Sequence, residues 1–170
     1  IPNRFKENRK INIGGIAGIK TYKDILKSHY NDSLVFVDSG SFLAENEQHN
    51  YTQFLRNYLD YNSGNLGIKE FQITPTGSQS YQRYIDSLTR KSQFPIIASN
   101  IFDLKKASQV QWEGVVESSI QEVAEIKIGY IGVITPNATK QIPDRQINGL
   151  YFQNAAKKII FQAKALKRKG

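Results

Sequence analysis

At 170 residues the chain is long enough to form one domain around a buried core. It contains no Cys, which excludes disulfides, thiol nucleophiles and zinc–cysteine sites, and no apolar run approaches the roughly 20 residues that a membrane-spanning helix needs. Basic residues near the two ends supply the net charge of +8, so the body of the chain is not basic and nucleic-acid binding is not expected. Because the chain begins with Ile1 and contains no Met, we expect a processed or partial polypeptide in which residues 1–170 form a single, incomplete domain.

Predicted helices alternate with predicted strands along the first part of the chain. Apolar residues recur at three- and four-residue intervals from Gly15 to Tyr30, which predicts an amphipathic helix. Its buried side would carry Ile16, Ile19, Tyr22, Ile25 and Leu26, with Lys20, Lys23 and Lys27 on the opposite side. Further along we expect buried strands over 34–38 and 94–101, helices over 51–59 and 78–92 with Ser78 as N-cap, a turn over 62–65 and a short strand over 66–68.

The second part of the chain predicts a β-hairpin and a final helix. Residues 115–123 and 126–135 are two β-rich runs separated by a short connection, which favours an antiparallel pair. The pattern over 150–169 predicts an amphipathic helix whose inward side chains are Phe152, Ala155, Ala156, Ile159, Ile160, Ala163 and Leu166. Alternating helices and buried strands indicate a layered α/β domain with an added hairpin.

Polar residues follow three of the predicted strands. They are Asp38 to Ser41, the loop at the end of residues 66–77 (LGIKEFQITPTG), and Ser99 with Asn100. In α/β sheets ligands usually bind at the carboxyl ends of the strands. We therefore expect these loops to converge on one crevice.

Four stretches carry a resemblance to a known family: GGIAGIKTY at 14–22, LVFVDSGSFL at 34–43, FPIIASNI at 94–101 and EIKIGYIGVITP at 125–136. In order and spacing they resemble the metallophosphatase (calcineurin-like phosphoesterase) domain of bacterial periplasmic 5′-nucleotidases and UDP-sugar hydrolases. The resemblance covers nearly the whole chain, and the terminal LKRKG resembles the run that leads into the family's next core strand. It implies a layered sandwich that holds two divalent metals, which activate a water for attack on a phosphate ester.

The positions that hold metal in that family carry other residues here. The family's Asp-Ala-Gly-Asp corresponds to Asp38-Ser39-Gly40-Ser41, so Ser41 takes the place of the bridging carboxylate, and the resemblance makes Asp38 structural. Counting back from Gly77 places residues 70–73 over Gly-Asn-His-Glu, so Phe71 replaces the Asn ligand and Gln72 the His. The family's first Asp-x-His is not found in residues 1–13, and its two later His residues would follow residue 170.

These substitutions predict a catalytically degenerate domain, retained for binding or scaffolding, with no metal and no cofactor of its own. A residual crevice lined by Ser41, Gln72 and Asn100 would accept a neutral polar ligand such as a sugar or nucleoside. The partner is otherwise an unknown protein, and the resemblance implies a periplasmic or otherwise exported location.

Two alternatives remain open from the sequence. In the first, the domain is an active metal-dependent phosphoesterase whose ligands lie outside the chain or in the loop that carries Glu45, Glu47 and His49. In the second, the basic C-terminal segment makes the domain an adaptor for acidic partners. His29 ends the first predicted helix and is expected to be an ordinary surface residue.

Overall fold

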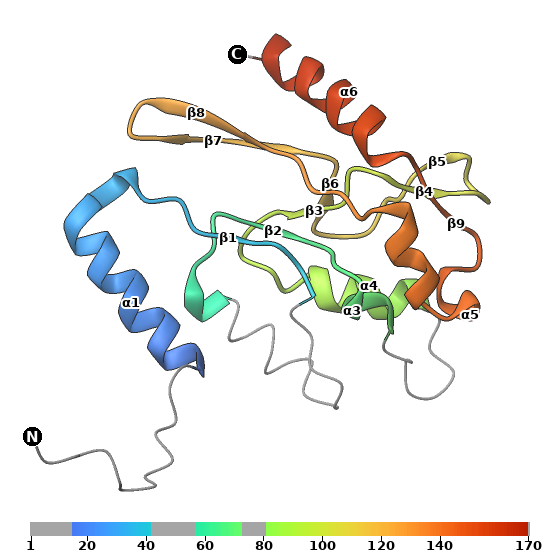
Figure 1. Cartoon of the computed structure of the whole chain (residues 1–170), viewed down its shortest axis with the longest axis horizontal. Helices are drawn as coiled ribbons and strands as arrows, with labels where there is room; N and C mark the ends of the chain where they lie inside the picture. The colour runs from blue at the N-terminus through green and yellow to red at the C-terminus, as the bar shows by residue number, and fades with distance from the viewer. Residues whose placement is uncertain (1–14, 42–56, 73–80, 170) are drawn as a thin grey trace, which may run out of the picture.

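Helices and short strands alternate along the described part of the chain (Figure 1). The computed structural model describes residues 15–41, 57–72 and 81–169. The first elements are α1 (Gly15–Tyr30), η1 (Asn31–Ser33), β1 (Val37–Asp38), β2 (Ser63–Asn65), α3 (Lys69–Gln72), α4 (Tyr81–Thr89), β3 (Ile96–Ile97) and β4 (Ile101–Asp103). They are followed by β5 (Ser108–Gln109), β6 (Val115–Val116), β7 (Ser119–Val123), β8 (Ile126–Tyr130), η2 (Pro136–Gln141), α5 (Asp144–Ile147), β9 (Leu150–Phe152) and α6 (Ala155–Arg168). None of the helices in the described ranges is long and apolar enough to span a membrane.

A parallel four-stranded sheet in the order β1-β2-β3-β6 organises the fold. Its central strands are buried, as expected for parallel strands that are covered on both faces. A second, antiparallel sheet has the order β5-β4-β9. Strands of both kinds with flanking helices confirm the predicted layered α/β class.

The predicted hairpin is present as β7 and β8, which pair antiparallel from Ser119↔Tyr130 to Val123↔Ile126. Its two turn residues, Ala124 and Glu125, have φ angles of 48° and 66°. Two successive positive φ angles are typical of the turn whose twist matches that of the flanking strands. The hairpin extends away from the parallel sheet between α1 and α6 (Figure 1).

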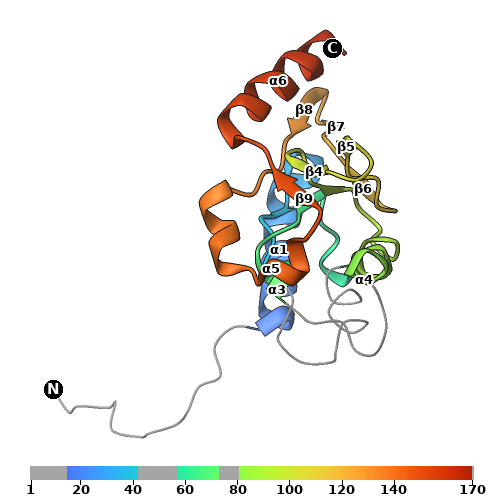
Figure 2. The same cartoon turned by 90° about the vertical axis from the view of Figure 1, so that its right-hand side faces the viewer.

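The main hydrophobic cluster lies between the sheets and helices α3 and α4. Phe71 is fully buried at its centre, with its ring centroid 6.2 Å from that of Trp112 and 5.7 Å from that of Phe152. Ile85, Ile96 and Ile101, each 0% exposed, belong to the same cluster. Seen from the side, α3, α4 and α5 lie together at one end of the sheets (Figure 2).

The turn predicted over 62–65 was wrong, because these residues include the central strand β2. Gly64 N donates to Pro95 O at 3.0 Å and Leu66 N donates to Ile97 O at 3.2 Å. Backbone hydrogen bonds to a neighbouring strand outweigh the turn preference of Ser63 and Gly64 here. The strand predicted over 66–68 was also wrong, and the loop expected after it begins instead with helix α3.

Two other predicted elements are divided. The single strand expected over 94–101 is two strands, β3 and β4, that belong to different sheets. The helix expected over 150–169 begins only at Ala155, because 150–152 form β9. Asn154 caps α6, and its side chain accepts a hydrogen bond from Lys157 N at 3.0 Å. Most of the helix predicted over 51–59 and the proposed N-cap Ser78 lie outside the described residues, although 57–59 are helical.

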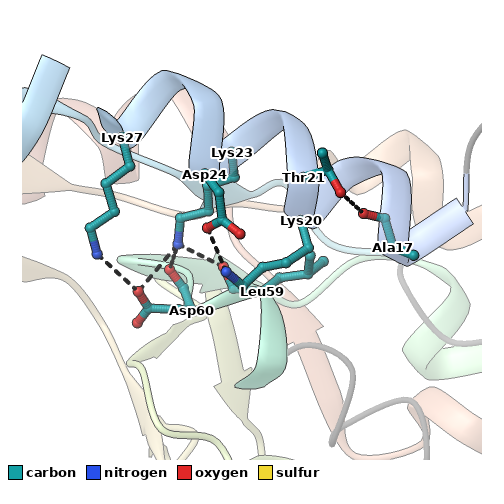
Figure 3. Close-up of polar contacts among 8 residues, drawn as sticks. All are labelled: Ala17, Lys20, Thr21, Lys23, Asp24, Lys27, Leu59 and Asp60. Carbon is teal, nitrogen blue, oxygen red and sulfur yellow. Dashed lines mark hydrogen bonds and ion pairs between the residues drawn. The ribbon is translucent and has the colours of Figure 1, made fainter. Parts of the chain in front are cut away.

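Helix α1 has the predicted bounds, but only Ile16 and Leu26 of its predicted inner side are half-buried, and Lys23 from the other side is buried with them. Lys23 is only 5% exposed, whereas Tyr22 and Ile25 are 64% and 58% exposed. The Lys23 ammonium donates to the carbonyl oxygens of Leu59, at 2.7 Å, and of Asp60, and Asp60 Oδ2 lies 3.3 Å away (Figure 3). Since these carbonyls end a short helix, the cation satisfies them and tethers α1 to the sheet.

The inner face predicted for α6 is correct only in part: Ala155, Ala163 and Leu166 are half-buried as expected, and Leu166 lies against Gly129 of β8. Ile159 and Ile160, predicted to face inward, are 41% and 57% exposed, while Gln162 is buried. Gln162 Nε2 donates to the Glu117 carboxylate, and Lys158 Nζ lies 3.0 Å from the same carboxylate. The helix therefore also packs through a polar network with the end of β6, and the apolar pattern was wrong for Ile159 and Ile160.

The Lys23 tether makes a testable prediction for stability. Replacing Lys23 by Met removes a charged donor from buried carbonyls and should lower the free energy of unfolding by about 2 kcal/mol. Lys27→Met is the matched control, since Lys27 is exposed and its Nζ is 3.8 Å from Asp60, and it should change stability by less than about 0.5 kcal/mol. Urea unfolding followed by circular dichroism measures both, and equal losses would contradict the tether.

Candidate functional site

The loops after β1 and β2 are joined by one buried carboxylate, that of Glu70. Glu70 is 1% exposed, and its Oε2 accepts hydrogen bonds from Gly67 N at 2.7 Å and from Ser41 N at 3.0 Å. The Ser41 hydroxyl in turn accepts a hydrogen bond from Ile68 N at 3.1 Å. We call these contacts among Ser41, Gly67, Ile68 and Glu70 the loop clamp. The loop clamp holds the two loops against each other. Its side-chain oxygen atoms, which could otherwise bind a ligand, accept hydrogen bonds from backbone amides instead.

Two glycines make this close approach possible. A Cβ on Gly67 would overlap the backbone nitrogen and hydroxyl of Ser41 and lie 2.8 Å from the carbonyl carbon of Gly40. Gly40 has a φ of +91°, and its nitrogen donates to Asp38 Oδ1 at 2.8 Å. The Asp38 carboxylate thus holds the first loop in the bent conformation that brings Ser41 to Gly67.

Ser41, Gln72 and Asn100, the residues predicted to line a shared crevice, make hydrogen bonds to three different parts of the chain. Ser41 is exposed and belongs to the loop clamp. Gln72 is also exposed, and its Nε2 donates to Gln141 O at 3.1 Å. Asn100 is 0% exposed; its Nδ2 donates to the carbonyl oxygens of Ile134, at 2.7 Å, and of Gln153, at 2.9 Å. The Asn100 amide therefore fastens the connection between β3 and β4 to the segments that follow β8 and β9.

A cavity of about 520 Å³ lies beside these loops, over the ends of β1, β2 and β3. Asp38 and Ser39 line it from the first loop, Asn65 from β2, and Tyr130 from β8. Asn65 Nδ2 lies 3.4 Å from the carbonyl oxygens of both Ser39 and Val133, so this side chain spans the cavity's two walls. Neither Asn65 nor Tyr130 was predicted from the sequence; the carboxyl-end rule applied to the true strand β2 would have found Asn65.

Burial affects the chemistry of Tyr130. It raises the pKa of the Tyr130 hydroxyl above its ordinary value, because the phenolate would lose solvation. The group therefore stays protonated at neutral pH and can donate as well as accept a hydrogen bond. Tyr130 is therefore a poor general base.

The residues around the loop clamp do not fit a pair of divalent metals. Within the described ranges, no three His, Asp or Glu side chains lie together in a way that could hold a metal ion. The Glu70 oxygen that faces the loops already accepts two amide protons, and Ser41 supplies a neutral hydroxyl that also accepts one. His29 is exposed at the end of α1, while Glu45, Glu47 and His49 lie outside the described residues.

Comparisons with known proteins bear on this arrangement. No protein-family model matches the chain, and a search of curated proteins found no match. Among solved structures, NAD nucleotidase (NadN) from Haemophilus influenzae matches with a TM-score of 0.70 and 19% identity, over 92% of this chain and 30% of that one. Calcineurin-like phosphoesterase YfkN from Bacillus subtilis matches with a TM-score of 0.74 and 17% identity, over 95% of this chain and 52% of that one.

The fold is metallophosphatase-like. A putative 5′-nucleotidase from Staphylococcus aureus agrees, with a TM-score of 0.69 and 19% identity over 99% of this chain and 32% of that one. These matches confirm the resemblance seen in the sequence. The chain spans only about a third to a half of the length of these structures, and at such low identity the likeness establishes the fold alone.

The loop clamp of this metallophosphatase-like fold can be tested through Gly67. Gly67→Ala should lower the free energy of unfolding by about 2 to 3 kcal/mol, because the new Cβ meets backbone that cannot move freely. Gly18→Ala is the control: Gly18 lies within α1, where an added Cβ would meet nothing within 4 Å, so Ala should stabilise by up to about 1 kcal/mol. Thermal and urea unfolding of the two variants should move in opposite directions; a neutral Gly67→Ala would mean that the loops are not clamped.

Proposed function

We propose that this chain is a catalytically degenerate, 5′-nucleotidase-like metallophosphatase domain retained for binding or scaffolding. The observation that carries the proposal is the loop clamp. At the edge of the sheet where the resemblance implies metal ligands, the Ser41 hydroxyl and the Glu70 carboxylate are bonded to backbone amides of the chain itself. Export, implied by the same resemblance, is part of the proposal.

The clamp also favours a different alignment with the family's Gly-Asn-His-Glu pattern. Phe71, which counting back from Gly77 placed in the Asn position, is fully buried in the core and does not lie in a loop. Gly67 and Glu70 have the spacing of the pattern's first and last residues and are hydrogen-bonded to each other. In this alignment Ile68 and Lys69 take the two middle positions, and neither an alkyl group nor an ammonium can serve as a metal ligand.

Electrostatics supports the loss of the metal pair. Two divalent cations about 4 Å apart repel each other by on the order of 15 kcal/mol at an effective dielectric constant of about 20. A bridging carboxylate offsets this repulsion, whereas the Ser41 hydroxyl carries no charge, and the Lys69 ammonium would add to it. The same site cannot then supply the activated water on which the family's reaction depends.

A direct assay distinguishes our proposal from the rival one, in which the domain is an active phosphoesterase whose metal ligands lie elsewhere. We expect the purified full chain to contain no stoichiometric metal by elemental analysis and to hydrolyse p-nitrophenyl phosphate at the buffer rate with added Mn²⁺ or Zn²⁺. Cooperative unfolding, measured beforehand, verifies that the purified chain is folded. Bound metal together with turnover would overturn the proposal and direct attention to Glu45, Glu47 and His49.

A second candidate function is an adaptor for acidic proteins, and the outer surface of α6 favours it. Ile160 and Phe161 are 57% and 60% exposed there. Exposed cations surround them, and none of these has an ion-pair partner within the described part of the chain: Lys157, Lys164, Lys167, Arg168 and Lys169. Apolar side chains set among unpaired cations suit a partner that is acidic and partly apolar.

Charge-neutralised variants test this second candidate. The chain should bind immobilised poly-L-glutamate at low salt, and Lys164→Gln/Lys167→Gln/Arg168→Gln should weaken that binding at least tenfold. Lys105→Gln/Lys106→Gln removes two exposed lysines distant from α6 in sequence and should have a smaller effect. Equal losses in the two variants would show a general effect of net charge and would eliminate α6 as a specific surface.

A further inference from the structure

One side of α6 carries exposed apolar side chains in a row with exposed cations. Its members have the spacing i, i+3, i+4, i+7 and i+11, which places them on the same side of a helix: Lys157, Ile160, Phe161, Lys164 and Arg168. We call these five residues the outer face of α6. All of them are exposed, whereas Gln162 on the opposite side of the helix is buried. The outer face is therefore the part of α6 that is open to a partner.

The charge of α6 has one sign. Its sequence, AAKKIIFQAKALKR, contains four Lys and one Arg but neither Asp nor Glu. Within the described part of the chain, the only one of these cations with an ion-pair partner is Lys158, which pairs with Glu117. Because no carboxylate on the helix neutralises the other cations, the outer face attracts a surface of negative charge.

The mixture of side chains on the outer face favours a lipid surface over an acidic protein. A basic amphipathic helix is typical of segments that bind at a membrane surface. The long stems of Lys and Arg let their charged groups reach lipid phosphates while Ile160 and Phe161 enter the boundary of the acyl chains. A folded acidic protein would instead need a concave apolar site for these two side chains, with carboxylates placed around its rim.

The place of α6 in the molecule agrees with such a surface. The helix lies at the periphery of the fold in both views (Figures 1 and 2), so its outer face can approach an extended surface. It has 14 residues, fewer than the roughly 20 that cross a bilayer. A helix of this length can lie along the interface between headgroups and acyl chains.

We propose that the outer face of α6 attaches the domain to an anionic lipid surface. The proposal concerns the same surface as the second candidate function, and it assigns lipid to that surface in place of an acidic protein. The attachment depends on both charge and apolar insertion. Salt weakens it, because anionic headgroups attract Lys and Arg only within a short screening length.

Binding of the full chain to lipid vesicles tests the proposal. We expect at least tenfold tighter binding to vesicles of equimolar phosphatidylcholine and phosphatidylglycerol than to pure phosphatidylcholine, measured by co-sedimentation at low salt. Neither measurement involves metal or hydrolysis, so the result is independent of the assays for the degenerate domain. Absence of binding to the anionic vesicles, or equal binding to both kinds, would overturn the proposal.

A variant that keeps every cation separates lipid from an acidic protein. Phe161→Gln removes only apolar surface and should weaken vesicle binding at least tenfold, while binding to poly-L-glutamate changes less than twofold. Tyr22→Gln is the matched control, because Tyr22 is an exposed aromatic residue on a different helix, α1, and it should leave vesicle binding unchanged. Thermal unfolding verifies that both variants fold. Unchanged vesicle binding by Phe161→Gln, or equal losses for vesicles and poly-L-glutamate, would contradict insertion and leave an acidic protein as the partner.

Discussion

The structure around the candidate site depends on the carboxylate of Glu70. Buried and accepting hydrogen bonds from Ser41 N and Gly67 N, it joins the loop after β1 to the loop after β2. Gly67 permits this contact because it has no side chain, and the helix that carries Glu70 leads directly into the core through Phe71. One buried side chain therefore links the edge of the parallel sheet to the hydrophobic cluster.

This clamp changes what the edge of the sheet can do. Ser41 Oγ and Glu70 Oε2 accept hydrogen bonds from backbone amides of the chain itself. Asp38, Asn65 and Tyr130 line the adjoining cavity, and none of the described residues that line it is a Lys, Arg or His.

Polar contacts also determine how the two longest helices pack. Lys23 attaches α1 through the carbonyl oxygens of Leu59 and Asp60, and Gln162 with Lys158 attaches α6 through Glu117. Both helices consequently leave apolar side chains, such as Ile25 and Ile160, at the surface. A buried charge or amide with good partners costs less than one without, so these contacts allow Lys23 and Gln162 to be buried beside the half-buried apolar residues Leu26 and Leu166.

The sequence by itself determined the α/β class, the bounds of α1, the β7–β8 hairpin and the fold that the resemblance implied, because periodicity and turn chemistry are local properties. It misassigned β2 as a turn, and it missed that Lys23 of α1 and Gln162 of α6 are buried while Ile25 and Ile160 are exposed. Only the tertiary structure decided these features, because the hydrogen-bond partners lie far along the chain. Gly64 pairs with Pro95, and Lys23 with Leu59, which is 36 residues away. The cavity with Asn65 and Tyr130 likewise exists only once separate strands are brought together.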